Sequence, residues 1–256
     1  SIFLTDLNTE NIKMTLENNF LKVTISEYGA EIKSLLDANN KERMWSADPA
    51  FWGKTSPILF PIVGSLKENT FYHNEKAYHL SRHGFARDQK FEVNKISDTK
   101  ITFLLKDSDT TREVYPFKFS LEITYELTNN KLNCSYQVKN LSNEEMCFSI
   151  GAHPAFATEG LENFFLEFEF KEDLKALKLE NGLISDFKKE ITLNDRKLQL
   201  NHDLFKSDAL VFRKLKSSFM ILRNNKNNET IKLNFKDFSH FGIWTTPEAN
   251  FICLEP

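Results

Sequence analysis

The segment Phe117-Lys-Phe-Ser-Leu-Glu-Ile-Thr-Tyr-Glu-Leu-Thr128 alternates between apolar and polar residues without a break. Because successive side chains of a strand point to opposite faces, this period of two predicts a β-strand with one buried and one wet face. The pair Asn129-Asn130 follows and is typical of a tight turn, since Asn tolerates a positive φ. The alternation resumes over residues 132–138. The two segments predict an antiparallel hairpin, with Cys134 as a thiol in the core.

Short strands are expected along most of the chain. No window of about eleven residues holds a 3.6-residue apolar stripe, so helices should be few and short. Strands at roughly ten-residue spacing predict an all-β fold, built as a large antiparallel sandwich. The sequence has no internal repeat and no linker rich in Pro, Ser or Gly, which favours one domain over residues 1–256. The polar stretches 107–113 and 224–229 are interpreted as solvated loop tips. The further predicted strands are residues 23–27, 31–36, 71–80 folded at 74–75, 91–96, 101–106, 146–150, 164–170, 219–223 and 231–235.

Composition narrows the classes of partner. In 256 residues, 33 Lys and Arg against 36 Asp and Glu give a formal net charge of −3. A near-neutral chain with interspersed signs has no electrostatic footprint for nucleic acid or an anionic membrane. The longest apolar run, residues 58–63, is far shorter than the roughly 20 residues of a membrane span. The first residues lack a signal-peptide pattern. Only 8 Gly, against 24 Phe, argue against a Gly-rich phosphate loop. These features predict a cytoplasmic protein with a small-molecule partner.

Cysteine and histidine spacing predicts no metal site and no metal cofactor. Three cysteines without a CxxC pair are interpreted as reduced, buried thiols. Among the histidines, His73, His79 and His83 are the one close group. Ten residues of strand span about 33 Å, so a single ion cannot reach all three unless the hairpin folds back. The cysteines are Cys134, Cys147 and Cys253.

Two histidines have unusual neighbours. His83 lies between Arg82 and Gly84, where a glycine lets the backbone approach a ligand closely. A strand-end imidazole hydrogen-bonded to a loop explains the same residues equally well. His153 precedes Pro154, which favours an extended backbone, and it follows the predicted strand 146–150. Its small neighbours are expected to leave the ring exposed, so a functional role and a hydrogen-bonded core histidine both stay open.

Two carboxylates enter apolar segments. Glu255 ends the run 250–256, which is typical of a strand buried on both faces. An ionised Glu there would be costly unless it is hydrogen-bonded or catalytic. Burial would also raise its pKa toward the range useful to a general base. Asp208 begins a second apolar segment, where a turn or strand start explains it equally well.

Taken in order, these segments resemble the aldose 1-epimerase (galactose mutarotase) family, in its shorter bacterial branch associated with lactose and galactose use. The resemblance covers nearly the whole chain, and the ordered set of motifs is more specific than any one of them. The matching segments are Glu27-Tyr-Gly-Ala-Glu-Ile-Lys-Ser34, Trp45, Phe51-Trp52, Pro57-Ile-Leu-Phe-Pro-Ile-Val-Gly64, His83-Gly-Phe-Ala-Arg87, Gly151-Ala-His-Pro-Ala-Phe156, residues 205–209, Gly242-Ile-Trp244 and Cys253-Leu-Glu-Pro256.

The resemblance implies a β-supersandwich with a sugar site in an open cleft. It implies interconversion of the α and β anomers of a free aldose without a cofactor. Glu255 matches the carboxylate that takes the proton from the C1 hydroxyl, and His153 matches the imidazole that protonates the ring oxygen. His83 matches a second histidine that polarises the ring oxygen, and Asp208 an acid that holds sugar hydroxyls.

Tryptophans suit the apolar faces of a pyranose, and a core role explains them equally well. The three are Trp45, Trp52 and Trp244.

Two departures from the family pattern leave alternatives open. Many relatives carry an Arg after the Pro-Ile-Val-Gly match, where this chain has Ser65-Leu66-Lys67, and Arg82, Lys67 or Arg87 is expected to replace that cation. Relatives also continue beyond Glu-Pro. Either the sequence is trimmed there, or its base lies one residue from a fraying terminus. Residues 1–13 are interpreted as leader sequence.

Two other functions remain as alternatives to anomer exchange by an active enzyme. The departures favour a weakly active or non-catalytic sugar-binding protein. The cations Lys67, Arg82 and Arg87 instead favour a hexose 6-phosphate as substrate, because arginine suits phosphate oxygens. Sugar identity, anomeric preference and oligomeric state do not follow from the sequence.

Overall fold

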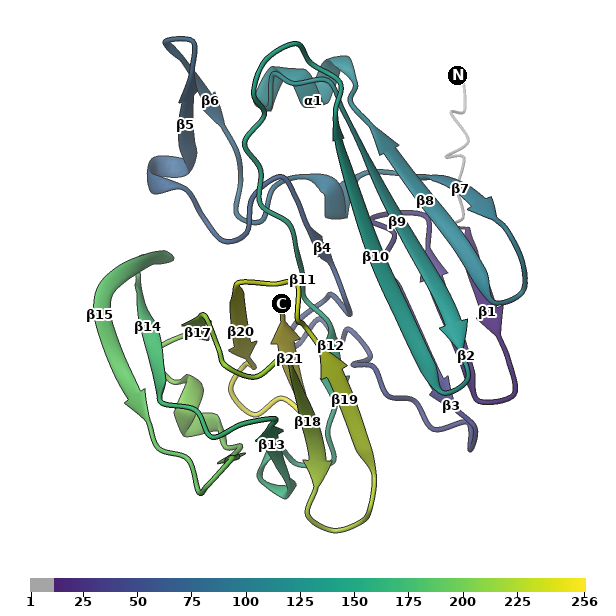
Figure 1. Ribbon diagram of the computed structural model, residues 1–256, viewed down its shortest axis with the longest axis vertical. Helices are drawn as coiled ribbons and strands as arrows, with labels where there is room; N and C mark the ends of the chain where they lie inside the picture. The colour runs from purple at the N-terminus through teal and green to yellow at the C-terminus, as the bar shows by residue number, and fades with distance from the viewer. Residues whose placement is uncertain (1–11) are drawn as a thin grey trace, which may run out of the picture.

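The computed structural model describes residues 12–256, which fold into antiparallel β-sheets with few helical turns (Figure 1). The prediction of an all-β fold is confirmed. The leader interpretation of residues 1–13 falls almost wholly outside the described residues. Within them the helical elements are α1 (Asp109–Val114), η1 (Lys67–Asn69), η2 (Ala86–Asp88), η3 (Leu161–Asn163) and η4 (His202–Phe205).

The predicted hairpin forms half of a four-stranded sheet. β9 (Phe119–Thr128) pairs with β10 (Lys131–Asn140), and Asn129 takes a φ of 53° in the turn. The sheet order is β10-β9-β8-β7, with β8 (Lys100–Lys106) and β7 (Glu92–Lys95). Because β10 is an edge strand, its apolar side is only partly covered, and Cys134 is exposed. The prediction of a core thiol at Cys134 is wrong for that reason.

Two smaller sheets come from the first part of the chain. β1 (Lys13–Glu17), β2 (Leu21–Ser26) and β3 (Ile32–Asp37) form a three-stranded antiparallel sheet. β5 (Thr70–His73) and β6 (Lys76–His79) form the second predicted hairpin. Asn74 and Glu75 both have positive φ there, so the turn lies where the sequence predicts it.

The second half of the chain builds the sheets that carry the C-terminal strand. In the six-stranded sheet the order is β12-β21-β20-β17-β14-β15, and in the four-stranded sheet it is β16-β13-β18-β19. β11 (Gly151–Ala152) pairs with β4 (Ile58–Leu59). The strands of the six-stranded sheet are β12 (Ala155–Ala157), β21 (Phe251–Glu255), β20 (His240–Trp244), β17 (Leu210–Arg213), β14 (Leu174–Glu180) and β15 (Leu183–Ile191). Those of the four-stranded sheet are β16 (Lys197–Gln199), β13 (Phe164–Phe168), β18 (Phe219–Asn224) and β19 (Thr230–Asn234).

Strand β21 is buried on both faces, as its apolar sequence predicts. Ile252 and Leu254 point into the large hydrophobic core. Phe251 and Cys253 belong to a separate small cluster with Trp45. Figure 1 places the end of β21 near the centre of the view, and the strand is paired on both sides by β12 and β20. Glu255 is therefore held in a ladder rather than at a frayed end.

Residues 146–150 form no strand, contrary to prediction. Their backbone groups find partners outside a ladder: the Ser149 N–H donates to the Pro61 carbonyl, and the Cys147 carbonyl accepts from the Tyr115 hydroxyl. Cys147 is exposed, so Cys253 is the one cysteine that is buried as predicted. The sequence does not predict strand β15, because β15 is mostly exposed and its sequence lacks an apolar alternation.

Residues 107–113 hold a short helix where the sequence predicts a solvated loop. The Thr111 N–H donates to Ser108 Oγ, and the Ser108 N–H donates to Thr111 Oγ1. This reciprocal capping box satisfies the first free donors of α1. Arg112 pairs with Asp107 and Asp109, so these charges bond one another rather than only water.

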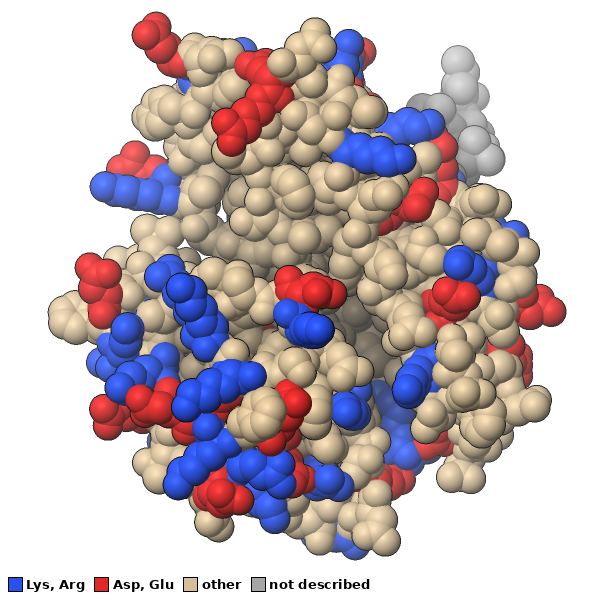
Figure 2. Space-filling model, viewed as in Figure 1, with Lys and Arg blue, Asp and Glu red and all other residues tan. Residues whose placement is uncertain are grey.

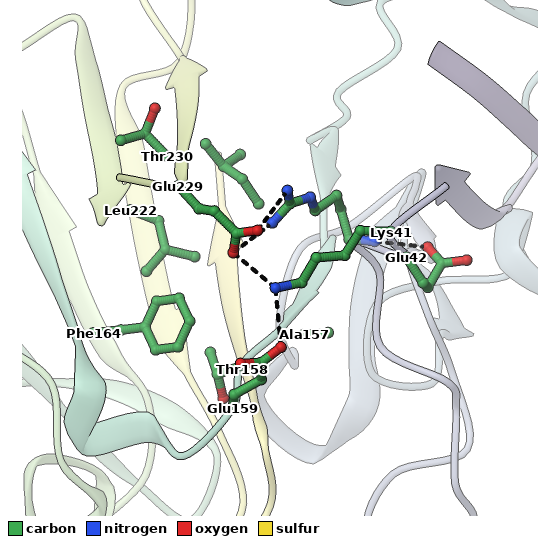
Figure 3. Close-up of a pocket in the computed structure, with 11 residues that line it drawn as sticks. Lys41, Glu42, Ala157, Thr158, Glu159, Phe164, Leu222, Glu229 and Thr230 are labelled. Carbon is green, nitrogen blue, oxygen red and sulfur yellow. Dashed lines mark hydrogen bonds and ion pairs between the residues drawn. The ribbon is translucent and has the colours of Figure 1, made fainter. Parts of the chain in front are cut away.

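The second predicted loop tip, 224–229, takes part in an ion cluster (Figure 3). Glu229 Oε2 lies 2.8 Å from Lys41 Nζ and 3.1 Å from an Arg43 nitrogen. Arg43 also pairs with Asp37, and Lys41 lies 2.9 Å from Glu159 Oε1. The cluster ties the end of β3 to the β18–β19 turn.

The surface and the helices give two further findings. No helix within residues 12–256 is long and apolar enough to cross a bilayer. Basic and acidic side chains are interspersed over the face drawn in Figure 2.

Candidate active site

Glu255 and His153 are neighbours in the structure, although they lie 102 positions apart in the sequence. His153 lies between β11 and β12, where the Leu254 N–H donates to the Pro154 carbonyl. This pairing brings the end of β21 against the imidazole, and His153 Nε2 lies 3.3 Å from Glu255 Oε1. The Glu255 side chain is 14% exposed and His153 is 7% exposed. The expectation of an exposed His153 ring is therefore wrong.

Aromatic rings explain why His153 is buried. Trp52 stacks on its imidazole, with ring centroids 4.8 Å apart and planes 29° apart. Trp244 meets it edge-on at 5.7 Å, and His83 does so at 5.8 Å. Small neighbours in the sequence do not expose the ring, because the rings that cover it come from distant segments.

Burial governs the protonation of this pair. Loss of water raises the pKa of Glu255 to about 8; the Arg82 guanidinium opposes this shift and the Asp208 carboxylate adds to it. Burial lowers the pKa of His153 to about 3, with His83 and the nearby guanidinium groups acting in the same direction. Both groups are therefore uncharged at neutral pH, with the proton on Glu255.

His83 is fixed by its own loop. The Gly64 N–H donates to His83 Nδ1 at 3.0 Å, so the ring proton is on Nε2, which is left as a donor. Gly84 has a φ of 69°, and a Cβ there would stand 2.3 Å from the Phe60 carbonyl oxygen, so only glycine fits. Burial, aided by Arg82, lowers the pKa of His83 to about 4. His83 is thus neutral: its Nδ1 accepts from the loop and its Nε2–H is a donor. The bond to the loop agrees with the sequence interpretation of His83 as an imidazole hydrogen-bonded to a loop.

The other residues predicted for the site differ in placement. Asp208 has a φ of 120°, and its Oδ1 accepts from the Ala209 N–H at 2.7 Å. The charges of Asp208 and exposed Arg82 both act on Glu255. Trp244 contacts His153, as described above. Lys67 is exposed in η1, and no hydrogen bond or ion pair in residues 12–256 joins it to these groups.

For two residues, the sequence does not show the contacts that they make at the site. The sequence offers Trp52 as a sugar or core residue, and nothing in its local spacing points to the stack on His153. Cys253 was interpreted only as a core thiol. A signal existed for it: residues two apart on a strand share a face, so Cys253 and Glu255 project together.

One group of three potential metal ligands occurs in the described part of the chain. The ligand atoms of His153, Cys253 and Glu255 all lie within 4.8 Å of one another. The three histidines weighed from the sequence do not converge. His73 bonds Glu144, His79 bonds Thr70, and His83 bonds Gly64.

Comparison with known proteins shows the family to which the chain belongs. The family model described as Aldose 1-epimerase matches residues 13–256. The chain belongs to the aldose 1-epimerase family. Two curated proteins from Lactococcus lactis subsp. lactis are similar to this chain: the plasmid protein LacX at 33% identity and the chromosomal protein LacX at 32%. Each match covers 94% of this chain and 86% of the relative. The resemblance drawn from the sequence is confirmed.

Solved structures confirm the fold of this epimerase-family chain. A galactose mutarotase related enzyme from Lactobacillus acidophilus superposes with a TM-score of 0.91 at 39% identity, over 96% of this chain and 85% of that one. A galactose mutarotase-like protein from Lactobacillus casei ATCC 334 also gives 0.91, at 31% identity, over 96% and 87%. The antiparallel β-supersandwich is therefore the fold of this protein.

Proposed function

We propose that this protein is an aldose 1-epimerase that interconverts the α and β anomers of a free aldohexose. The contact of 3.3 Å between His153 Nε2 and Glu255 Oε1, in a buried site lined by aromatic rings, is the observation that carries the proposal. Anomer exchange opens a hemiacetal, which needs a base at the C1 hydroxyl and an acid at the ring oxygen. An adjacent Glu and His supply both.

The proposed cycle uses each group twice. Glu255 removes the proton of the C1 hydroxyl while the His153 imidazolium donates a proton to the ring oxygen, so the bond between C1 and the ring oxygen breaks and an aldehyde forms. Rotation about the C1–C2 bond then presents the other face of the carbonyl. The C5 hydroxyl attacks C1 and returns its proton to His153, while Glu255 protonates the new C1 hydroxyl. The pair ends as it began.

This cycle starts from an ionised pair, whereas burial leaves the free pair neutral with its proton on Glu255. In the free protein His153 Nε2 and Glu255 Oε1 lie 3.3 Å apart without a hydrogen bond, so only a small approach of the two side chains is needed for a proton to pass between them. The Arg82 guanidinium favours the carboxylate, and sugar hydroxyls that donate to it act in the same direction. We infer that substrate binding converts the neutral pair into the ionised pair.

Four residues around the pair are proposed to bind the sugar. His83 offers its Nε2–H to the ring oxygen, since its Nδ1 is occupied by the Gly64 N–H. Asp208 accepts from sugar hydroxyls, and Arg82 donates to them. The edge-on ring of Trp244 closes the apolar side of the site.

Polarimetry tests this function. Fresh α-galactose and α-glucose should relax to their equilibrium rotation faster with the protein than without it. Glu255→Gln removes the acid/base group and should slow the catalysed relaxation about 10²–10⁴-fold. The matched control is Glu113→Gln, which makes the same chemical change at an exposed residue of α1 and should relax at the wild-type rate.

Two outcomes would overturn the proposal. One is equal relaxation with and without protein at neutral pH. The other is a Glu255→Gln variant as active as the wild type. Sugar binding in calorimetry without acceleration would instead identify a sugar-binding protein.

A phosphorylated hexose is the second candidate substrate. Arg82 is exposed, its charge reaches Glu255, and it makes no ion pair within residues 12–256, so it is a cation available to a phosphate. If this candidate is right, a hexose 6-phosphate should have a higher kcat/KM than the free sugar, and Arg82→Ala should remove that advantage. Equal losses on both substrates would assign Arg82 to hydroxyl binding.

A further inference from the structure

We propose that His153, Cys253 and Glu255 form an inhibitory site for a thiophilic divalent cation of the zinc and cadmium type. The three side chains come from the loop before β12 and from one face of β21, and their ligand atoms lie within 4.8 Å of one another. Among the described residues, Glu255 Oε1 is also buried without a hydrogen-bond partner. Buried polar atoms of this kind are candidates for an external ligand.

The distances fit a small tetrahedral ion. Zinc bonds nitrogen, oxygen and sulfur at about 2.0–2.3 Å, which holds ligand atoms about 3.3–3.7 Å apart. His153 Nε2 and Glu255 Oε1 are already 3.3 Å apart. Because the widest separation of the set is within 4.8 Å, side-chain movements of about 1 Å bring Cys253 Sγ into range.

The donor set selects the metal. A thiolate and an imidazole favour zinc and cadmium, whereas magnesium and calcium prefer sets of oxygen ligands. Carboxylate and thiolate together balance a divalent charge, and both the Glu255 carboxyl proton and the Cys253 thiol proton leave to solvent as the metal bonds form. The charged or titratable groups that face the site are Arg82, Arg87, His83 and Asp208. Arg82 is exposed and free to move away from the ion.

The ring of His153 is already oriented for this role. Ligating histidines normally have their second nitrogen bonded to a partner, which fixes the ring. His153 Nδ1 lacks such a partner, but Trp52 stacks on the imidazole and holds its plane. Trp244 packs against the edge of the same ring. An ion bound here would occupy the atoms proposed for acid/base chemistry and would exclude the sugar.

Cadmium titration of the intact protein tests the site without relying on catalysis. Cadmium should give a thiolate-to-metal charge-transfer band in the ultraviolet, saturating at one ion per chain. The band should be absent in Cys253→Ser and present in Cys147→Ser and Cys134→Ser, whose thiols are exposed. Excess magnesium should neither produce nor weaken it.

A second pair of variants keeps the thiol and removes another ligand. Glu255→Gln and His153→Gln should each weaken cadmium binding more than about tenfold. Glu144→Gln is the matched control, because Glu144 and His73 form an exposed pair with atoms 3.0 Å apart, and its cadmium affinity should stay at the wild-type value.

Two results would overturn the site. One is an undiminished band in Cys253→Ser. The other is cadmium affinity in Glu255→Gln and His153→Gln equal to the wild type. If Cys253→Ser does not fold, these two variants still decide the question. Zinc should also slow mutarotation competitively with sugar, but the band alone separates failure of the site from failure of the proposed enzyme activity.

Discussion

The Glu255 side chain lies against Gly242 on the neighbouring strand. The two residues are paired across β20 and β21, and a Cβ built on Gly242 would stand 3.3 Å from Glu255 Cβ and 3.4 Å from its Oε2. The first separation is shorter than most contacts of a Cβ atom in folded proteins, and the second is at the short end of ordinary contact. Gly242 therefore gives the carboxylate space, and this space sets its position beside His153.

Gly242→Ala is expected to move the carboxylate without removing it. The added methyl group must push Glu255 by a few tenths of an ångström, and a misplacement of 1 Å can cost about 10²-fold in rate. We expect kcat for mutarotation to fall by about tenfold, with a smaller change in KM. Gly53→Ala is the control, because its nearest contact would be the Pro49 Cα at 4.0 Å. Unchanged kcat in Gly242→Ala would contradict this role.

Trp52 is expected to act as a positioning residue for His153. Trp52→Leu removes the stacked ring, admits water and so lets the pKa of His153 rise from about 3 toward its usual value. We expect a lower kcat and a new step in the pH–rate profile near neutral pH, with partial recovery in Trp52→Phe.

Trp45→Phe supplies the matched control for that variant. Trp45 belongs to the same aromatic cluster but packs on Phe51 and Phe251 rather than on His153. It should lose stability without the new pH step. A pH–rate profile of Trp52→Leu identical to the wild type would leave Trp52 with a packing role alone.

The sequence predicts strands that have a local apolar alternation, and it misses pairing and burial that depend on distant segments. The hairpin at Asn129 follows from a strict alternation, and Glu255 stands out because an acid ends an apolar strand. Residues 146–150 looked equally like a strand, yet their backbone partners are Pro61 and the Tyr115 side chain, which no local pattern reveals. The prediction that Cys134 is buried is wrong because an alternation of apolar and polar residues does not distinguish an edge strand from a central strand.

The same limit applies to the site. The resemblance to the family names the residues of the site but not their contacts. The stack of Trp52 on His153 joins residues 101 positions apart. The burial that shifts the pKa values of His153 and Glu255 arises only when the chain folds and brings such distant residues together.

Stability should fall as the pH rises from 6.5 to 8. The pKa of Glu255 is raised from 4.5 to about 8, so its contribution is complete below 4.5 and is lost as the pH rises to 8. The lowered pKa values of His153 and His83 act in the opposite direction, but mostly below their unfolded value of 6.5. Between pH 6.5 and 8 Glu255 therefore dominates the pH dependence of stability. One proton held by the folded protein but not by the unfolded chain over this window corresponds to about 2 kcal/mol in the free energy of unfolding.

Urea denaturation in a chelating buffer measures this dependence. The free energy of unfolding of the wild type should drop by about 2 kcal/mol between pH 6.5 and 8. Glu255→Gln cannot ionise and should show little of this drop, while the exposed substitution Glu113→Gln should follow the wild type. The same slope in Glu255→Gln would assign the drop to another group.

The ion cluster of Figure 3 should contribute measurable coupling between distant segments. Arg43 and Glu229 are 20% and 30% exposed at the side chain, and hydrogen bonds from Arg43 and Lys41 hold the pKa of Glu229 below its usual value. A double-mutant cycle of Arg43→Met and Glu229→Gln should give about 1 kcal/mol of coupling in the free energy of unfolding.

The exposed pair Lys22 and Glu17, 3.2 Å apart, is the control for this cycle and should give close to zero, because water screens both of its charges. Raising the salt concentration separates the two cases further. Screening removes what coupling the exposed pair has, whereas the partly buried cluster should keep most of its own. Equal coupling in the two cycles would mean that the cluster does no more than an ordinary surface ion pair, and that packing alone holds β3 against the β18–β19 turn.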